Sequence, residues 1–209
     1  MMISISFTAV TVIGMALLCG MLVLRFSKTT QRLQEDTGTR ILEQVNQELD
    51  TYLRDMMQLS DTICYRVLKN IDLEESTPTE SLELLYEENR NELISIAIFQ
   101  ESGSLVAAAP ALDLKTGVRP QEQQWFIRAL DQIENQHFSA PYVQNLFQTG
   151  AEWPWVISLS RHVELTYGGE TRRGVLLLDM SFSGLEKVCR NEGIPGGGGT
   201  CILLIAAVK

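Results

Sequence analysis

One carboxylate stands inside the most apolar strand-like segment of the chain. Asp179 lies within GVLLLDMSF, residues 174–182. Burying a carboxylate is costly unless the group is paired or hydrogen-bonded. The side chain is therefore expected either to bond to a nearby backbone turn or to face a cavity and bind a ligand there. Asp179 is the first candidate for a binding residue.

The second candidate is an aromatic pair in QEQQWFIRAL, residues 121–130. The apolar spacing over residues 121–133 predicts a helix. On a helix, the side chains of Trp125 and Phe126 differ in direction by about 100°, so both are not expected to point into the same sheet. We expect one ring to pack in the core and the other to line an edge or a pocket.

The sequence shows no catalytic or metal-binding constellation. His162 stands in a strand-like segment beside Arg161 and Glu164, and no residue is marked out as a nucleophile for it to activate. We expect His162 at an edge or at the surface. No metal site, cofactor or enzymatic activity of this chain is expected, because the cysteines form no CxxC pair and stand apart from both histidines; they are Cys19, Cys64, Cys189 and Cys201.

Length and charge narrow the class of protein. The chain has 209 residues, enough for one domain with additional segments, and a formal net charge of -9. Its basic residues are scattered, whereas neutralising phosphates requires clustered Lys and Arg. No nucleic-acid partner is expected.

The N-terminus carries the strongest compositional signal. Residues 3–24 contain no charge, and about 20 apolar residues span a bilayer as a helix. No basic residue precedes the run and no good cleavage site follows it, which favours an uncleaved transmembrane helix (residues 1–27) over a signal peptide. Arg25, Lys28 and Arg32 follow the span. The positive-inside rule would place them in the cytoplasm, in conflict with the extracytoplasmic location inferred below.

A long helix is predicted after this span, from about residue 30 to residue 70. Apolar residues recur there at alternating spacings of three and four, the pattern of one helix face: Leu42, Val45, Leu49, Tyr52, Met56, Leu59 and Ile63. We assign residues 28–72 to this stalk helix, and a second, short helix is expected at residues 81–89.

The periodicity then changes to that of strands. Residues 172–182 are so apolar that a central strand covered on both faces is expected, and Gly168 and Gly169 are expected to form the turn before it. The other predicted strands are 93–100 and 105–110 (a hairpin), 137–144, 154–165 and 201–208. Alternation along 154–165 is expected to place Ser158 and Ser160 on one side of the strand and Arg161 on the other. The fold class is α+β, a long N-terminal helix followed by an antiparallel sheet with flanking helices. Because the chain stops directly after a strand, we expect the front part of a longer protein or a truncated gene product.

In this order the segments resemble the extracellular double Cache domain of bacterial membrane sensors. The resemblance covers about residues 30–205 and rests on ISIAIFQESGSLVAA, QQWFIRAL, FSAPYVQ, WVISLSRHV and RRGVLLLDMSFSGLEKV. It implies a PAS-like sheet with flanking helices (the Cache fold). Residues 73–209 would be the membrane-distal subdomain, incomplete at its C-terminus, with an extracytoplasmic pocket for a small molecule.

The resemblance also implies which residues bind the ligand. In amino-acid-binding members, an Arg two residues before the Trp holds the ligand carboxylate, and an aromatic after the Trp, a later Tyr and an Asp in a late strand complete the pocket. The pattern falls here on Trp125, Tyr142 and Asp179, with Phe126 in place of the usual Tyr. Gln123 stands where the Arg would be, and an amide cannot pair bidentately with a carboxylate. A neutral or cationic ligand, or none, is therefore expected.

The segment SDTICYRVLKNIDL, at the end of the long helix, most resembles the ectodomains of sensor histidine kinases. The chain is thus expected to be the sensing part of a two-component histidine kinase at the cell membrane, dimerising through its long helix. The alternatives are the ectodomain of a chemoreceptor or diguanylate cyclase, and a membrane-anchored binding protein that does not signal.

Overall fold

The computed structural model describes residues 46–131, 136–148 and 154–182, together with residues 15, 21 and 43. The chain divides into two compact units, Met1–Gln47 and Glu48–Lys209, and the architecture that follows is that of the second. The predicted membrane span, apart from Met15 and Met21, and the predicted strand 201–208 lie outside the described residues. Within the described ranges, no helix has both the length and the apolarity needed to cross a membrane.

The first element is the later part of the predicted stalk. Residues 46–62 are α-helical and continue as a π-helix, η1 (Ile63–Val67), and a 3-10 turn, η2 (Leu68–Asn70). Leu49, Met56 and Ile63, three members of the predicted stripe, are buried. The predicted helix is thus confirmed from residue 46 to residue 70, while the division of the chain into a span, a stalk and a subdomain stays a prediction.

A six-stranded sheet forms the centre of the unit. Its order is β2-β1-β6-β5-β3, and β4 pairs with β5. All its strand pairs are antiparallel. The strands are β1 (Leu93–Gln100), β2 (Leu105–Ala109), β3 (His137–Phe138), β4 (Tyr142–Val143), β5 (Trp155–Tyr167) and β6 (Glu170–Ser181). The expected α+β class is confirmed. The strand predicted at residues 172–182 corresponds to β6, which lies between β1 and β5, so its expected central position is confirmed as well.

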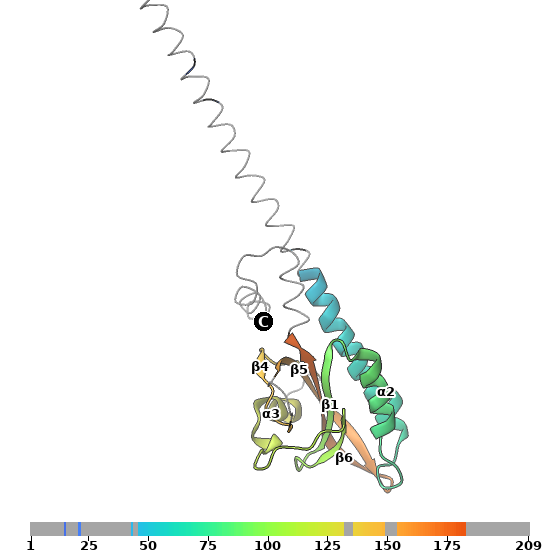
Figure 1. Ribbon diagram of the computed structural model, residues 1–209. Helices are drawn as coiled ribbons and strands as arrows, with labels where there is room; N and C mark the ends of the chain where they lie inside the picture. Colours follow the sequence, from blue (N-terminus) through green and yellow to red (C-terminus); the bar gives the residue numbers. More distant parts are fainter. Residues whose placement is uncertain are drawn as a thin grey trace, which may run out of the picture. The chain divides into compact units, whose positions relative to one another are not determined.

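Helices cover both faces of this sheet. The helix of residues 46–62 and α2 (Thr79–Asn89) lie on one face, and α3 (Gln124–Asp131) lies on the other (Figure 1). Alternation along β1 assigns its side chains to two cores, because successive residues of a strand point to opposite faces. Ile98 packs on the face of the first helix, and Phe99 packs on the face of α3.

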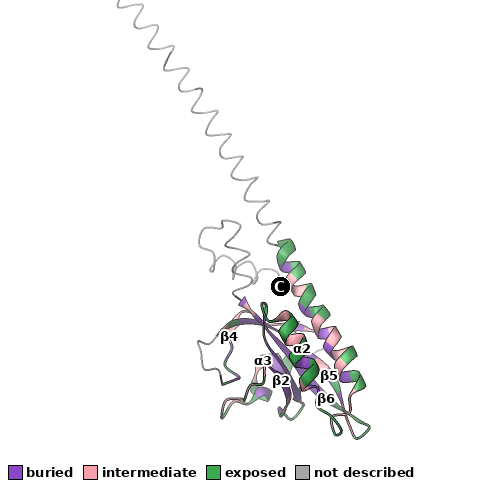
Figure 2. Cartoon of the chain, turned by 45° about the vertical axis from the view of Figure 1, so that its right-hand side comes forward, coloured by how far each residue is buried: buried purple, intermediate pink, exposed green. Residues whose placement is uncertain are grey.

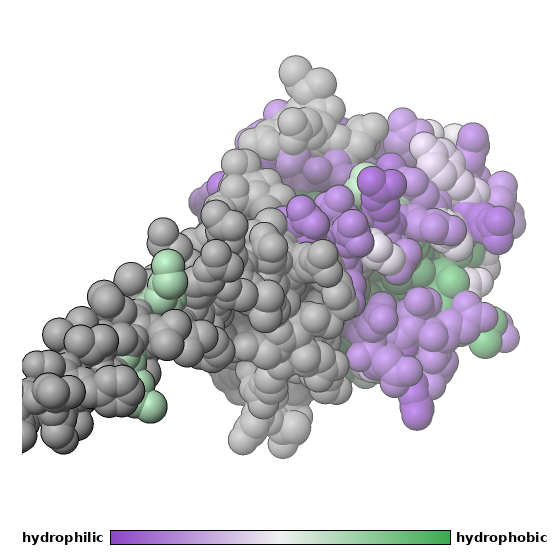
Figure 3. All heavy atoms as spheres, turned by 90° about the horizontal axis from the view of Figure 1, so that it is seen from above, coloured by the Kyte–Doolittle hydropathy of each residue, from purple (hydrophilic) through white to green (hydrophobic). Residues whose placement is uncertain are grey.

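Burial follows this layering. Figure 2 shows buried strands between helices whose outward faces are exposed. From above, hydrophilic residues cover most of the described surface, and apolar residues are visible between them (Figure 3). The described unit thus has a hydrophobic core on each face of the sheet, and each core is covered by helix.

One predicted strand is divided in two. Residues 137–144 were expected to form a single short strand, whereas β3 and β4 are separate two-residue strands. Both pair with β5, opposite Ser160 and Val156 respectively. Pro141 lies between them and has no N–H to donate to a ladder, which accounts for the interruption.

The turn between β5 and β6 is tied to the end of the first helix. Gly168 and Gly169 both have positive φ, 57° and 81°, as a tight hairpin turn requires. The Asp72 carboxylate accepts hydrogen bonds from the backbone N–H groups of Gly168, Gly169 and Glu74, at 2.9, 2.9 and 3.0 Å. These bonds hold the pKa of Asp72 below its ordinary value and fix the hairpin tip.

Protonating Asp72 should therefore release this tip. Its folded-state pKa is lowered, so the stabilisation is complete above the unfolded-state pKa and is lost as pH falls through the folded-state value, that is below about pH 4. We expect the NMR hydrogen-exchange protection of the Gly168 and Gly169 amides to decrease there. In Asp72→Asn the protection should be weaker at neutral pH and should lose this pH dependence. Asp113→Asn, at an exposed position elsewhere, is the control and should behave as wild type.

Candidate functional site

Strand register places three polar side chains side by side on the α3 face of the sheet. Asp179 of β6 lies directly opposite Ser95 of β1 and Ser158 of β5, and directly opposite residues of an antiparallel pair have neighbouring side chains. The hydroxyl of Ser95 donates to Asp179 Oδ2 at 2.9 Å, and that of Ser158 donates to Oδ1. The Asp179 side chain is fully buried.

Two further side chains contact the Asp179 carboxylate or its partners. They are Tyr142, in the short strand β4, and Gln144, the residue after this strand. The Tyr142 hydroxyl lies 2.8 Å from Ser158 Oγ and 3.5 Å from Asp179 Oδ1. Gln144 Nε2 donates to Asp179 Oδ2 at 3.2 Å. Within the described part of the chain, the carboxylate is thus held by side chains, and not by the backbone turn that was one of the two expectations for Asp179.

Burial and hydrogen bonding act in opposite directions on this carboxyl. Desolvation is the larger effect and raises the pKa of Asp179 above its ordinary value, while the bonds from Ser158, Ser95, Gln144 and Tyr142 lower it. Burial also raises the pKa of the Tyr142 phenol, and the nearby Asp179 raises it further. Tyr142 therefore remains a neutral hydrogen-bonding group at physiological pH.

A pocket of about 310 Å³ opens beside this cluster, between α3 and the strands β3, β4 and β5. Three of the five predicted binding residues line it: Gln123, Trp125 and Tyr142. The pocket therefore brings together residues that stand about 20 positions apart in the sequence. Its other walls include Arg128, His137, Phe138 and Ser160.

The aromatic pair departs from the prediction. Trp125 and Phe126 are both buried, with 8% and 2% of their surface exposed, and both rings contact Phe99 of β1, at centroid distances of 5.6 and 6.4 Å. The expectation that both would not point into the same sheet was wrong. The rings are large enough for side chains that diverge by about 100° to meet one aromatic ring lying between them. Trp125 lines the pocket as well, whereas Phe126 belongs to the core. The expectation of one ring in the core and the other at a pocket is thus confirmed.

Asp179 is not a wall of the pocket, but it is connected to one. Tyr142 lines the pocket and shares a hydrogen-bonded network with Ser158 and Asp179. The carboxylate therefore fixes the position of the Tyr142 hydroxyl. Of the predicted set, Gln123, Trp125 and Tyr142 lie at the pocket, Asp179 lies behind it, and Phe126 lies in the core.

Sequence reasoning missed several members of the site. Arg128 lies four residues after Gln124 on α3, and both line the pocket. The helical spacing of four was a usable signal for Arg128. Ser158 and Ser160 were predicted to share one side of a strand, which the structure confirms. Their link to Asp179 and to the Trp125 carbonyl depends on strand and helix placement, and no local signal predicts it.

Comparisons with known proteins identify the fold. No protein-family model matches the chain, and no curated protein matches its sequence. Similar solved structures include the ligand-binding domain of the Pseudomonas fluorescens chemoreceptor CtaA in complex with L-alanine (TM-score 0.52, 15% identity, covering 70% of this chain and 59% of that chain). Another is the ligand-binding domain of the Pseudomonas aeruginosa amino acid chemoreceptor PctC in complex with GABA (TM-score 0.50, 18% identity, 68% and 58%).

An extracellular ligand-binding receptor from Desulfohalobium retbaense is also similar (TM-score 0.50, 19% identity, covering 73% of this chain and 26% of that chain). This chain spans less than two thirds of the length of the chemoreceptor domains it matches. At these identities the likeness establishes the architecture. The described part of the chain has the fold of the Cache-type ligand-binding domains of bacterial chemoreceptors.

Proposed function

We propose that the chain is the extracytoplasmic, small-molecule-sensing part of a membrane signal-transduction protein, and that the ligand binds between α3 and the strands β3, β4 and β5. The observation that carries the proposal is the pocket of about 310 Å³ at that place, lined by Gln123, Trp125 and Tyr142. Pockets of a few hundred Å³ with aromatic walls and a few placed polar groups are typical of small-ligand sites. We assign the chain a binding role and no catalytic one.

The lining residues define a ligand class. Gln123 by itself argues for a neutral or cationic ligand, because it replaces the expected Arg. Arg128, however, supplies a guanidinium at the same pocket, and guanidinium pairs with carboxylates. The solved chemoreceptor domains hold ligands such as L-alanine and GABA. We propose a carboxylate-bearing molecule of amino-acid size, with its carboxylate at Arg128 and its apolar part on Trp125.

Signalling would pass through the long helix. Met56 and Ile63 pack against the sheet in the core on the opposite face from the pocket. A ligand that binds one arrangement of sheet and helix more tightly shifts the population toward it. We propose that two copies associate through this helix and that the change passes along it to the membrane.

The output module is proposed as a histidine kinase, from the resemblance of residues 60–73. A chemoreceptor receives equal support, because the similar solved structures are chemoreceptor domains. The coding sequence downstream of codon 209 distinguishes the two. A phosphoacceptor His with an ATP-binding region supports the kinase, and a coiled-coil signalling tip supports the chemoreceptor. A cyclase domain would support the diguanylate cyclase. A reading frame that contains none of these three modules would favour the binding protein that does not signal.

Arg128→Gln tests the ligand assignment. In a thermal-shift screen of the purified 209-residue chain, we expect at least one small amino or carboxylic acid to raise Tm, since a ligand at about 100 times its Kd stabilises by about 2.7 kcal/mol. Arg128→Gln should weaken that ligand's binding about 5- to 10-fold, because it removes one exposed charge-assisted contact. Isothermal titration measures the change.

Arg90→Gln is the matched control. Arg90 is also exposed, but it pairs with Glu87 and does not line the pocket. Its variant should bind the ligand as wild type does. A screen in which no small acid raises Tm, or a ligand that Arg128→Gln binds with unchanged affinity, would contradict the assignment.

A further inference from the structure

The pocket between α3 and the strands β3, β4 and β5 carries positive charge, and none of the described residues that line it is acidic. Its ionisable lining residues are Arg128, His137 and Tyr142. Arginine is cationic and histidine is neutral or cationic, while burial raises the pKa of the Tyr142 phenol and keeps it neutral. No described carboxylate forms an ion pair with Arg128. A ligand in this pocket therefore meets a guanidinium without a countercharge.

Asp179 lies behind the pocket, but its oxygens are already used. Ser95 and Gln144 donate to Oδ2 at 2.9 and 3.2 Å. Ser158 donates to Oδ1, and the Tyr142 hydroxyl lies 3.5 Å from the same oxygen. A carboxylate offers about four acceptor positions, which these groups occupy. Because Asp179 is also fully buried and is not a wall of the pocket, a ligand ammonium group could pair with it only by leaving a buried donor unpaired.

The same network leaves Tyr142 an acceptor for the ligand. Its hydroxyl proton is used within the network, because the Ser158 hydroxyl donates to Asp179 and can only accept from Tyr142 in their contact of 2.8 Å. A phenol oxygen whose proton is engaged keeps a lone pair for a further donor. Tyr142 lines the pocket, so a hydroxyl group of the ligand can donate to it.

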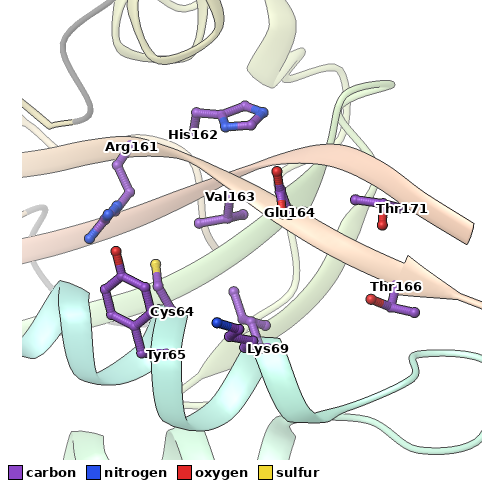
Figure 4. A pocket seen from close by; sticks show the side chains of 10 residues that line it. Cys64, Tyr65, Lys69, Arg161, His162, Val163, Glu164, Thr166 and Thr171 are labelled. Carbon is purple, nitrogen blue, oxygen red and sulfur yellow. The ribbon is translucent and has the colours of Figure 1, made fainter. Parts of the chain in front are cut away.

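The acidic residue of β5 lies too far along the strand to supply the missing charge. Figure 4 shows a second pocket, across β5 and against the first helix, where Arg161 reaches toward that helix while His162 and Glu164 point to the opposite side. Ser160, which lines the pocket at α3, faces the same way as Glu164, because alternate residues of a strand share a side. Glu164 stands about 13 Å beyond Ser160 at the rise of a strand and does not line that pocket. It therefore does not compensate a charge held at Arg128.

An ammonium group beside the ligand carboxylate would be unpaired in this setting. In a 2-amino acid it is bonded to the carbon next to the carboxylate, so pairing that carboxylate with Arg128 brings the ammonium group to roughly 6 Å from the guanidinium. At an effective dielectric constant of about 20, two like charges at that distance lower the affinity about tenfold or more. Burial also raises the pKa of Asp179, so a full negative charge behind the pocket is disfavoured. A hydroxyl group at the same carbon avoids this cost.

We propose that the pocket selects small 2-hydroxy acids over the corresponding 2-amino acids. The carboxylate pairs with Arg128, the hydroxyl group donates to Tyr142, and the apolar part lies on Trp125. The hydrogen bonds that hold Asp179 determine this selectivity, because they keep the carboxylate from a ligand ammonium group. The inference rests on the proposed function, since it assumes that a ligand carboxylate binds at Arg128.

Matched pairs of hydroxy and amino acids test the selectivity. The pairs are glycolate and glycine, L-lactate and L-alanine, and L-2-hydroxyisocaproate and L-leucine, and the members of each pair differ only in the group beside the carboxylate. Each compound is titrated into the purified 209-residue chain at neutral pH by isothermal calorimetry. In every pair that binds, we expect the Kd of the hydroxy acid to be at least about tenfold lower than that of the amino acid.

Gln123→Glu should shift the selectivity toward the amino acid. Gln123 lines the pocket, and this variant adds a carboxylate with little change of shape. The position directly precedes α3, where a negative charge is favourable, so the fold should be kept. We expect the ratio of the two Kd values to move about two- to fivefold toward the amino acid. Gln58→Glu is the control, because Gln58 is exposed on the first helix and does not line the pocket, and its ratio should equal that of wild type.

The outcomes separate this inference from the proposed function. If an amino acid binds as tightly as its hydroxy counterpart, or if Gln123→Glu leaves the ratio unchanged, the selectivity is overturned while a carboxylate-binding pocket stands. If no member of any pair binds, or if Arg128→Gln binds the hydroxy acid with unchanged affinity, the assignment of the ligand carboxylate to Arg128 fails as well.

Discussion

Phe126→Ala is expected to destabilise the fold by about 3–5 kcal/mol, the usual cost of emptying the space of a buried Phe. Phe126 is 2% exposed and packs in the same cluster as Phe99, Trp125 and Leu177. Its ring contacts the Phe99 and Trp125 rings at 6.4 and 5.5 Å. Such aromatic pairs add about 0.5–1.5 kcal/mol beyond the burial of area. Urea denaturation followed by circular dichroism measures the loss.

The same variant distinguishes a packing role of Phe126 in the core from a role as a ligand contact in the pocket. Ile127→Ala, at the next position of α3 and 37% exposed, is the control and should change stability by less than about 1 kcal/mol. Phe126→Leu keeps an apolar side chain and should lose less than the Ala variant, with ligand affinity near that of wild type. A small loss in Phe126→Ala combined with greatly weakened binding would instead make Phe126 a ligand contact, and the core assignment would be wrong.

Asp179→Ala is expected to destabilise the fold by about 3 kcal/mol. Without the carboxylate, Ser95, Ser158 and Gln144 lose their shared acceptor in a buried setting, and each buried donor left unpaired costs about 1–3 kcal/mol. Removing a desolvated carboxyl offsets part of this loss, so the total stays below the sum. The Tyr142 hydroxyl also loses its anchor, and ligand binding at the pocket should weaken in parallel.

The pH dependence of stability tests whether the Asp179 carboxyl group titrates as its burial implies. Burial raises the folded-state pKa of Asp179 above its unfolded value. Its contribution to stability is therefore greatest below the unfolded-state pKa and decreases as pH rises through the folded-state pKa. The unfolding free energies of wild type and Asp179→Asn are measured in urea from about pH 4 to about pH 8. As pH rises, the free energy of wild type should fall relative to that of Asp179→Asn. A difference that is flat across that range contradicts this role.

Most of the secondary structure was predictable because it rests on local periodicity. The apolar stripe through Leu49, Met56 and Ile63 predicted the helix that buries them. Alternation in residues 154–165 predicted that Ser158 and Arg161 lie on opposite faces of β5, and they do, with partners on opposite sides of the sheet. These patterns need no knowledge of other segments, since the periods of 3.6 and 2 are properties of the backbone.

The candidate site was predictable only in part. Trp125, Tyr142 and Gln123 were assigned to a pocket through the resemblance, and all three line one. The expectation that Trp125 and Phe126 would not face the same sheet was wrong, because a helix period does not give the position of the Phe99 ring, which both rings contact. Tertiary position, and not helix phase, decides what two neighbouring aromatic rings contact.

The sequence by itself determined that Asp179 would be buried in a central strand and would need partners, because an apolar run around a carboxylate implies both. Only the tertiary structure decided which partners. They come from three other parts of the chain, at Ser95, Ser158 and the Tyr142–Gln144 segment. Their convergence depends on the registers of β1 and β5 against β6. Register between distant strands is set by the packing of the whole core, which no local pattern encodes.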